Sequence, residues 1–202
     1  MATDAATGPD RRNRILDAAE RVFAEEGYHG TTLREIARVA DVKLSLIGYH
    51  FESKLALYTA IFVRRQHINE ERLRRLEAIE NLDAPDALEQ IVSAFLDPVV
   101  DPREDGGWYQ RLVFREAADP SCPERGVMGA LFDPMARKFI EALKCALPGK
   151  APGFHQWCYL FAVGALAQSV FDDRIASLGG VPGAAEKNDL LRSFITAAMR
   201  YS

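Results

Sequence analysis

The chain has 202 residues, of which 48% are hydrophobic and 27% are charged. These proportions are typical of a globular protein of one or two domains, and they exclude intrinsic disorder, a collagen-like chain and a small disulfide-stabilised fold. The formal net charge is −4, from 25 basic and 29 acidic side chains. Because the chain has no general excess of positive charge, any contact with nucleic acid must come from one local surface.

The cysteines and the apolar runs bear on the compartment and on metal or membrane binding. Cys122, Cys145 and Cys158 are widely spaced and form neither a Cys-x-x-Cys pair nor a cluster with metal-ligand spacing. We therefore expect reduced thiols, no metal and no cofactor. The first ten residues lack the apolar core of a secretory signal, and the longest apolar run, 157–167, is too short to span a membrane. A cytoplasmic protein without a membrane partner is expected.

Almost every periodic stretch has the helical period, and no alternating strand pattern of useful length occurs. Apolar residues in 15–23 recur at spacings of three and four, and Gly27 is placed to end this first helix. Thr32 and Glu35 have the spacing of a capping box, which predicts the start of a second helix that runs through Val39.

The rest of the chain is also expected to be helical. A four-residue corner at 40–43 leads to a third short helix that ends near His50. Ser53 then caps a long fourth helix, expected to continue to about Ile79. Turns that contain proline and glycine separate the remaining helices, which are expected at 85–97, 108–118, 124–147, 153–176 and 187–200. The predicted fold class is all-α.

Residues 32–50 have the spacing of a helix-turn-helix. Two helices that cross steeply over a short turn must approach closely, and Ala37 is a small residue at the crossing. Aliphatic side chains are spaced to fill the shared core at Ile36, Val42 and Ile47. The turn requires a residue that tolerates a left-handed backbone, and Asp41 is one of the few side chains other than glycine that does. On these residues alone a plain helical hairpin remains the alternative.

The flanking chain carries further motifs in the same register. They are Ile15-Leu16-Asp17-Ala18-Ala19, Phe23-Ala24-Glu25-Glu26-Gly27-Tyr28, Thr31-Thr32, Ile36-Ala37, Ala40, Val42, Tyr49-His50-Phe51 and Ser53-Lys54. With these motifs the segment from Arg14 to Leu57 resembles the N-terminal domain of TetR-family transcriptional regulators. The later part of the chain is similar to that family only in being all-helical and of the expected length.

The resemblance implies a homodimer that binds a double-stranded DNA operator with its third helix in the major groove. The residues expected to contact DNA are Thr31, Thr32, Arg34, Lys43, Leu44, Ser45, Tyr49, His50 and Lys54. The start of the second helix offers N–H groups and hydroxyls to a phosphate, and the third helix can reach base edges. Lys54 matches the family's backbone-contacting lysine.

Three positions depart from the family pattern. Gly48 stands where the family most often has a tyrosine, so the backbone contact of that tyrosine is missing. Lys43 and Ser45 replace the usual small polar residue and glycine. The fold tolerates these changes, but the operator sequence does not follow from the residues.

We expect three parts in the chain: a flexible tail at 1–10, the helix-turn-helix domain at 11–54, and a larger effector-binding and dimerisation domain at 55–202. The last two helices are apolar on more than one face. In proteins that resemble this one, the last two helices of each subunit form a four-helix interface. Burial of these faces within one subunit is the alternative.

The resemblance also implies a cavity for a small molecule in the larger domain. The candidate lining residues are Arg111, Phe114, Met128, Phe132, Trp157 and Phe161. They favour a hydrophobic or amphipathic effector. Aromatic residues and methionines at helical spacing are, however, more often plain core.

The leading interpretation is a one-component repressor. Two-fold symmetry requires half-sites about one helical turn apart, roughly 34–36 Å, and an effector that prefers another spacing would release the DNA. A helical protein-interaction adaptor without specific DNA binding is the alternative. An enzyme has little support, because the chain has no HExxH, P-loop, GxGxxG or GxSxG motif, and no catalytic residue is assigned.

Overall fold

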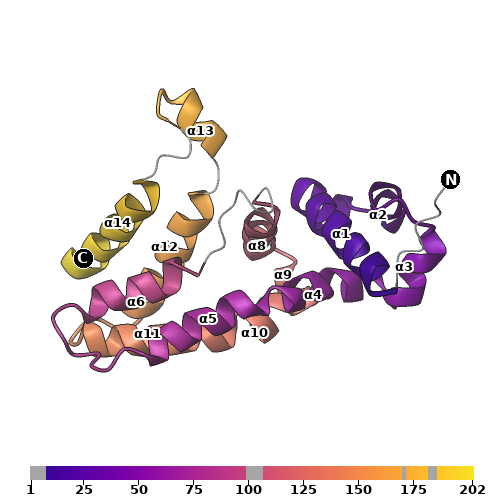
Figure 1. The fold of residues 1–202 in the computed structure, drawn as a ribbon. Helices are drawn as coiled ribbons and strands as arrows, with labels where there is room; N and C mark the ends of the chain where they lie inside the picture. Colours follow the sequence, from indigo (N-terminus) through magenta and orange to yellow (C-terminus); the bar gives the residue numbers. More distant parts are fainter. Residues whose placement is uncertain (1–7, 99–106, 170–171, 182–185) are drawn as a thin grey trace. The chain divides into compact units, whose positions relative to one another are not determined.

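The computed structural model describes residues 8–98, 107–169, 172–181 and 186–202. In this part of the chain all regular secondary structure is helical, as the periodicity predicted, and no strand is present (Figure 1). None of the helices described is long and apolar enough to cross a membrane.

The chain divides into two compact units. The first consists of Met1–Gln66 and Asp105–Leu131, and the second of His67–Glu104 and Phe132–Ser202. This division differs from the predicted boundary between residues 54 and 55. The packing of the helices described next explains why the boundary lies elsewhere.

Helix α1 (Gly8–Gly30) is the support of the first unit. α4 (Lys54–Arg64) and α8 (Trp108–Ala118) both pack against it, so residues predicted for the larger domain belong to the N-terminal unit. Gly27 interrupts α1 with φ 74° and ψ 172°, in a region that only glycine adopts readily. The predicted helix end at Gly27 is therefore confirmed as a break, after which the chain continues in a last helical turn.

Helices α2 (Leu33–Val39) and α3 (Leu44–His50) form the helix-turn-helix. The Thr32 hydroxyl accepts a hydrogen bond from the N–H of Glu35 at 3.2 Å, which confirms the predicted cap. Asp41 has φ 51° and is the one non-glycine residue in the described part of the chain with positive φ. The left-handed corner predicted at Asp41 is confirmed.

The predicted long fourth helix is two helices. Ser53 caps α4 through a hydrogen bond from the N–H of Ala56 at 3.0 Å, but the helix ends at Arg64. Arg65 has φ −97° and ψ 6°, and its N–H donates to the carbonyl of Phe62 instead of continuing the ladder. α5 (Gln66–Glu77) follows.

A buried carboxylate accounts for this break. Glu20 of α1 is 3% exposed and accepts hydrogen bonds from Nη2 of both Arg64 and Arg65 at 2.7 Å. Neighbouring side chains on a regular α-helix point about 100° apart. The irregular turn at Arg65 lets two consecutive guanidinium groups converge on one carboxylate.

The predicted helix at 124–147 is also divided. It consists of α9 (Cys122–Arg125), α10 (Val127–Leu131) and α11 (Asp133–Ala146). Gly126 leaves the helix with φ 68°, and Pro134, which has no N–H to extend a preceding helix, falls in the first turn of α11. Sequence periodicity continued across both interruptions and concealed them.

The second unit is built from most of α5 and from α6 (Ala87–Leu96), α11, α12 (Phe154–Gln168) and α14 (Lys187–Tyr201), with the short α13 (Asp172–Ser177) between the last two. The predicted helix at 153–176 thus appears as α12 and α13, and its residues 170 and 171 lie outside the described residues. Phe95, Phe139 and Tyr159 meet at the centre of this core with ring centroids 5.5 and 5.7 Å apart.

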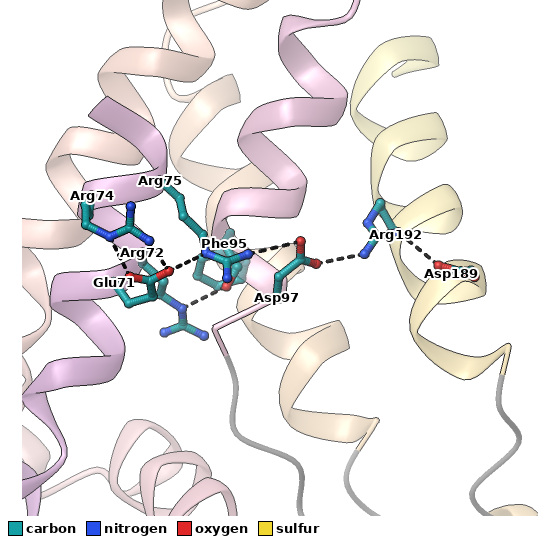
Figure 2. A network of polar contacts seen from close by, with 8 residues as sticks. All are labelled: Glu71, Arg72, Arg74, Arg75, Phe95, Asp97, Asp189 and Arg192. Carbon is teal, nitrogen blue, oxygen red and sulfur yellow. Dashed lines mark hydrogen bonds and ion pairs between the residues drawn. The ribbon is translucent and has the colours of Figure 1, made fainter. Parts of the chain in front are cut away.

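A network of charged side chains joins α5, α6 and α14 in this unit. Figure 2 shows Asp97 between Arg75 and Arg192, with nitrogen–oxygen distances of 3.4 and 2.7 Å. Glu71 binds Arg74 and Arg75, and these hydrogen bonds lower the pKa of its carboxyl to about 2. Through Asp97 the network links α5 and α14 to the end of α6.

The backbone at Gly27 yields a first prediction. Gly27→Ala forces a residue with a Cβ into this glycine-specific conformation and is expected to lower the free energy of unfolding by about 1–3 kcal/mol. Gly48→Ala is the matched control, because Gly48 is helical and a Cβ there would have nothing within 4 Å. The control is expected to raise the free energy of unfolding by about 0.5–1 kcal/mol. Equilibrium urea denaturation measures both, and equal effects would contradict the prediction.

Candidate nucleic-acid interface

Helix α3 packs on the first unit with one face and exposes the opposite face to solvent. Ile47 is fully buried beneath it, whereas Leu44 and Ser45 are exposed and Tyr49 is 82% exposed. Lys43, which directly precedes α3, is exposed as well. The predicted base-reading side chains therefore stand on one accessible surface, as a reading helix requires.

Arg14 holds the corner that orients α3. Its guanidinium donates to the carbonyl of Ala40 at 2.9 Å and lies 3.8 Å from the carboxylate of Asp41. The carbonyl groups at the end of α2 thus gain a charged donor from α1. Sequence reasoning missed this role, because Arg14 and Ala40 are 26 positions apart and no local pattern connects them.

The residues at the start of α2 do not all have the predicted placement. Thr32 and Arg34 are exposed, but Thr31 is 2% exposed. The hydroxyl of Thr31 donates to the carbonyl of Gly27 at 2.8 Å and fastens the chain to the end of α1. Thr31 is therefore removed from the candidate DNA-contacting residues, since its side chain is engaged and buried.

His50 is the last residue of α3, and Lys54 is the first residue of α4. The ring of His50 is half-buried and packs edge-on against Tyr49, with centroids 5.1 Å apart. The ammonium of Lys54 lies 4.6 Å from the centroid of the Tyr28 ring, and burial lowers the pKa of Lys54. Both side chains keep part of their surface accessible.

Three glutamates of this region are paired with arginines. Glu20 is buried with its two arginines, as described above. Glu35 pairs with Arg38 at 2.6 Å, and the hydrogen bond from that guanidinium lowers the pKa of the carboxyl. Arg21 likewise pairs with Glu25 at 3.3 Å. Paired carboxylates repel a phosphate less than free ones do.

A second buried carboxylate lies in the same unit. Glu116 accepts hydrogen bonds from the hydroxyl of Tyr58 at 2.9 Å and from Nε of Arg125 at 2.8 Å. Burial and the neighbouring carboxylate raise the pKa of Tyr58, so its proton stays on the hydroxyl. Arg125 also binds Asp119 at 2.9 Å, and the hydroxyl of Ser121 bonds to the carboxylate of Asp119 at 2.7 Å. This cluster fastens the segment after α8 within the first unit.

The predicted effector residues are divided between the two units. Arg111, Phe114 and Met128 belong to the first, and Phe132, Trp157 and Phe161 to the second. Trp157 and Phe161 are 60% and 68% exposed and stack on each other at 5.6 Å.

The second unit contains a cavity of about 20 Å³ between α6, α11, α12 and α14. It is lined by Ile91, Val92, Phe95, Phe139, Leu143, Tyr159, Ala162, Ile195 and Met199. None of the six predicted effector residues lines this cavity. Its volume is that of about one water molecule, so no effector fits without rearrangement.

Comparison with known protein families covers most of the chain. Residues 15–61 match the model described as "Bacterial regulatory proteins, tetR family", and residues 91–199 match "Tetracyclin repressor-like, C-terminal domain". The second match alone spans more than half of the 202 residues. The chain belongs to the TetR family of transcriptional regulators.

Curated TetR-family relatives align with about half of the chain. The HTH-type transcriptional regulator SrpR of Pseudomonas putida is 36% identical over 99 residues, which are 49% of this chain and 44% of SrpR. The HTH-type transcriptional repressor BepR of Brucella suis is 35% identical over 97 residues, 48% of this chain and 46% of BepR. The matched stretch thus spans less than half of the length of these two relatives.

Solved structures of regulators share the fold over nearly the whole chain. The fatty acid degradation regulator FadR from Bacillus halodurans has a TM-score of 0.67 at 16% identity and covers 98% of this chain and 97% of its own. A putative tetR family regulator from Shewanella sp. PV-4 has a TM-score of 0.62 at 18% identity, with 93% and 97% covered. At these identities the likeness establishes the fold alone.

The hydrogen bonds to Asp119 in this TetR-family protein are expected to contribute to the free energy of unfolding in a way that depends on pH. Hydrogen bonds from Ser121, with help from Arg125, lower the pKa of Asp119 to about 2, from about 3.8 in an unfolded chain. This contribution is fully present above the pKa that Asp119 has in the unfolded chain. It is lost as the pH falls through the pKa that Asp119 has in the folded protein. We expect Asp119→Asn to be less stable than the native chain near neutral pH, with a difference that shrinks between about pH 4 and pH 2.

Urea denaturation across this pH range measures the difference. Asp83→Asn is the control for the change in net charge, because the Asp83 carboxylate makes no hydrogen bond to any described residue. A stability difference for Asp119→Asn that is the same at every pH would contradict the prediction.

Proposed function

We propose that this TetR-family regulator is a ligand-responsive repressor that binds a palindromic operator as a homodimer. The observation that carries the proposal is the surface of α3, where Leu44, Ser45 and Tyr49 are exposed while Ile47 anchors the helix. Among its relatives, BepR is named a repressor and IcaR of Staphylococcus aureus a negative transcriptional regulator. Repression is the activity that these names support.

The side chains of the interface divide by chemistry into base readers and phosphate binders. Lys43 and Ser45 can donate to base edges in the major groove, and Leu44 can contact a thymine methyl group. Phosphates are proposed to bind the remaining accessible candidates, which are Thr32, Arg34, Tyr49, His50 and Lys54. The phosphate contacts position the protein on the duplex, and the three base readers determine the operator sequence.

The apolar surface of α12 and α14 supports a homodimer. These two helices pack together in the second unit and carry exposed large apolar side chains: Trp157, Leu160, Phe161, Leu190 and Phe194. Their spacings of three and four residues place them in a stripe along each helix. A stripe of this kind in water is characteristic of a protein interface, and a second copy of the same surface would cover it with two-fold symmetry.

The effector is proposed to act on the core of the second unit. The cavity there is apolar, so it favours a hydrophobic or amphipathic molecule. Because about 20 Å³ is too small for such a ligand, the molecule would bind a differently packed core. An effector that prefers one packing shifts the protein toward the dimer geometry that accompanies it. The sequence-based candidates Arg111, Phe114, Met128, Phe132, Trp157 and Phe161 do not line this cavity and stay predictions.

Selection from a random duplex library at two salt concentrations tests the DNA-binding proposal. We expect enrichment of a palindrome with half-sites about one helical turn apart, and binding that weakens as salt increases. Purely sequence-independent binding would contradict the proposal and would favour a helical adaptor. The enriched palindrome then serves as the probe in the experiments below.

Lys54 and Tyr49 are expected to contribute differently to operator binding. Lys54→Ala removes one phosphate contact per subunit, so we expect roughly tenfold weaker binding and a salt slope smaller by about two. Tyr49→Ala removes an uncharged donor and is expected to weaken binding without changing the slope. Fluorescence anisotropy over a salt series measures both quantities.

Lys138→Ala is the matched control, since Lys138 is an exposed lysine on α11 in the second unit. Its affinity and salt slope should equal those of the native chain. The assignment fails if Lys54→Ala and Tyr49→Ala bind as tightly as the native protein at every salt concentration.

The dimer surface is tested by placing a charge on it. Leu160 of α12 and Val63 of α4 are both 54% exposed, so neither substitution by glutamate disturbs a core. Leu160→Glu is expected to raise the dimer dissociation constant at least tenfold, because the charge would be desolvated in the interface. Val63→Glu should leave it unchanged. Sedimentation velocity measures both, and a fully dimeric Leu160→Glu protein would rule out this surface.

A further inference from the structure

An aromatic ring at the end of α1 contacts two cations of the first unit. The ring centroid of Tyr28 is 4.6 Å from Nζ of Lys54 and 5.0 Å from Cζ of Arg125. Both distances fall in the range of a cation–π contact. Lys54 is also a proposed phosphate contact, so the ring touches the DNA-binding machinery directly.

The ring of Tyr28 is held in place from several sides. It stacks on Phe23 with centroids 6.0 Å apart and planes at 10°, and it meets Tyr58 edge-on at 4.9 Å. Arg125 adds a third contact, and its charge is neutralised by the buried Glu116 and by Asp119. Two cations can therefore share one ring without a net repulsion between them.

Lys54 needs such a contact because of its position. It is the first residue of α4, where the partial positive charge of the helix N-terminus disfavours a cation. Lys54 forms no ion pair or hydrogen bond through its ammonium with any residue that the structure describes. The electron-rich face of the Tyr28 ring attracts the Lys54 ammonium and holds it in place.

We infer that Tyr28 is a positioning residue that holds the Lys54 ammonium in place for its contact with a DNA phosphate. The inference rests on the proposed function, to which it adds a residue that does not itself touch DNA. A lysine side chain has a flexible stem of four carbons and loses conformational freedom when its ammonium binds a phosphate. A lysine side chain that already lies on a rigid ring loses less conformational freedom on binding, so binding to the phosphate becomes more favourable.

The contact itself can be tested without DNA. Protons above an aromatic ring are shifted upfield in NMR spectra, so the Cε protons of Lys54 should lie upfield of those of Lys43, which contacts no ring among the described residues. The shift should persist in Tyr28→Phe and disappear in Tyr28→Leu. Identical Cε shifts for Lys54 and Lys43 in the native protein would overturn the inference, whether or not Tyr28→Leu folds.

The consequence for binding is tested by a double-mutant cycle on the selected palindrome. Tyr28→Leu is expected to weaken binding about threefold to tenfold in the native background and to have no further effect in the Lys54→Ala background. Tyr28→Phe, which keeps the ring, should bind nearly as well as the native chain. In the Lys43→Ala background the loss caused by Tyr28→Leu should remain complete, which makes that pair the matched control.

The two proposals fail in different ways. An equal loss from Tyr28→Leu in the native and Lys54→Ala backgrounds would mean that Tyr28 only stabilises the unit, which overturns the positioning role and leaves the proposed function intact. Absence of any selected palindrome for the native chain would overturn the proposed function and the DNA role of Lys54 together. The NMR shift then reports only on the contact between ring and lysine.

Discussion

The first unit depends on two buried carboxylates whose charges must be neutralised inside the protein. Glu20 of α1 meets Arg64 and Arg65, and Glu116 of α8 meets Arg125. A buried carboxylate without a cationic partner would cost several kcal/mol. Each carboxylate therefore fixes the place of a second segment, which is the end of α4 in one case and α9 in the other. These two constraints explain why the compact N-terminal unit extends well past the helix-turn-helix.

The same constraints make α1 the support of the proposed reading surface. Along its length α1 supplies Arg14 to the corner between α2 and α3, Glu20 to the end of α4, and Tyr28 to the start of α4. The reading helix and the helix that follows it are thus both fixed to one element. A rigid mounting of this kind is what sequence-specific contacts require, because a displacement of the reading helix misaligns every base contact at once.

Local chemistry could be predicted from the sequence, whereas long-range pairing could not. The cap at Thr32 and the left-handed corner at Asp41 depend on neighbours within three or four residues, and both predictions are confirmed. The break at Arg65 depends on Glu20, 45 positions away, and no glycine or proline marks it. The burial of Thr31 is a consequence of how α1 ends, so a hydroxyl next to a capping threonine gave no sign of it. The candidate interface was found because its motif is local, and its supports were missed because they are not.

The second unit shows why aromatic composition does not separate a ligand pocket from a subunit interface. α12 has an inner face, where Cys158 and Ala162 are buried, and an outer face, where Trp157, Leu160 and Phe161 are exposed. Both faces are apolar, so the sequence pattern predicts an effector site at Trp157 and Phe161 as readily as it predicts an interface there. With a second copy on the outer face, as proposed, α12 lies between the core cavity and the interface. An effector that repacks the core against α12 would then act on the same helix that sets the proposed dimer geometry, which would couple the two events through one element.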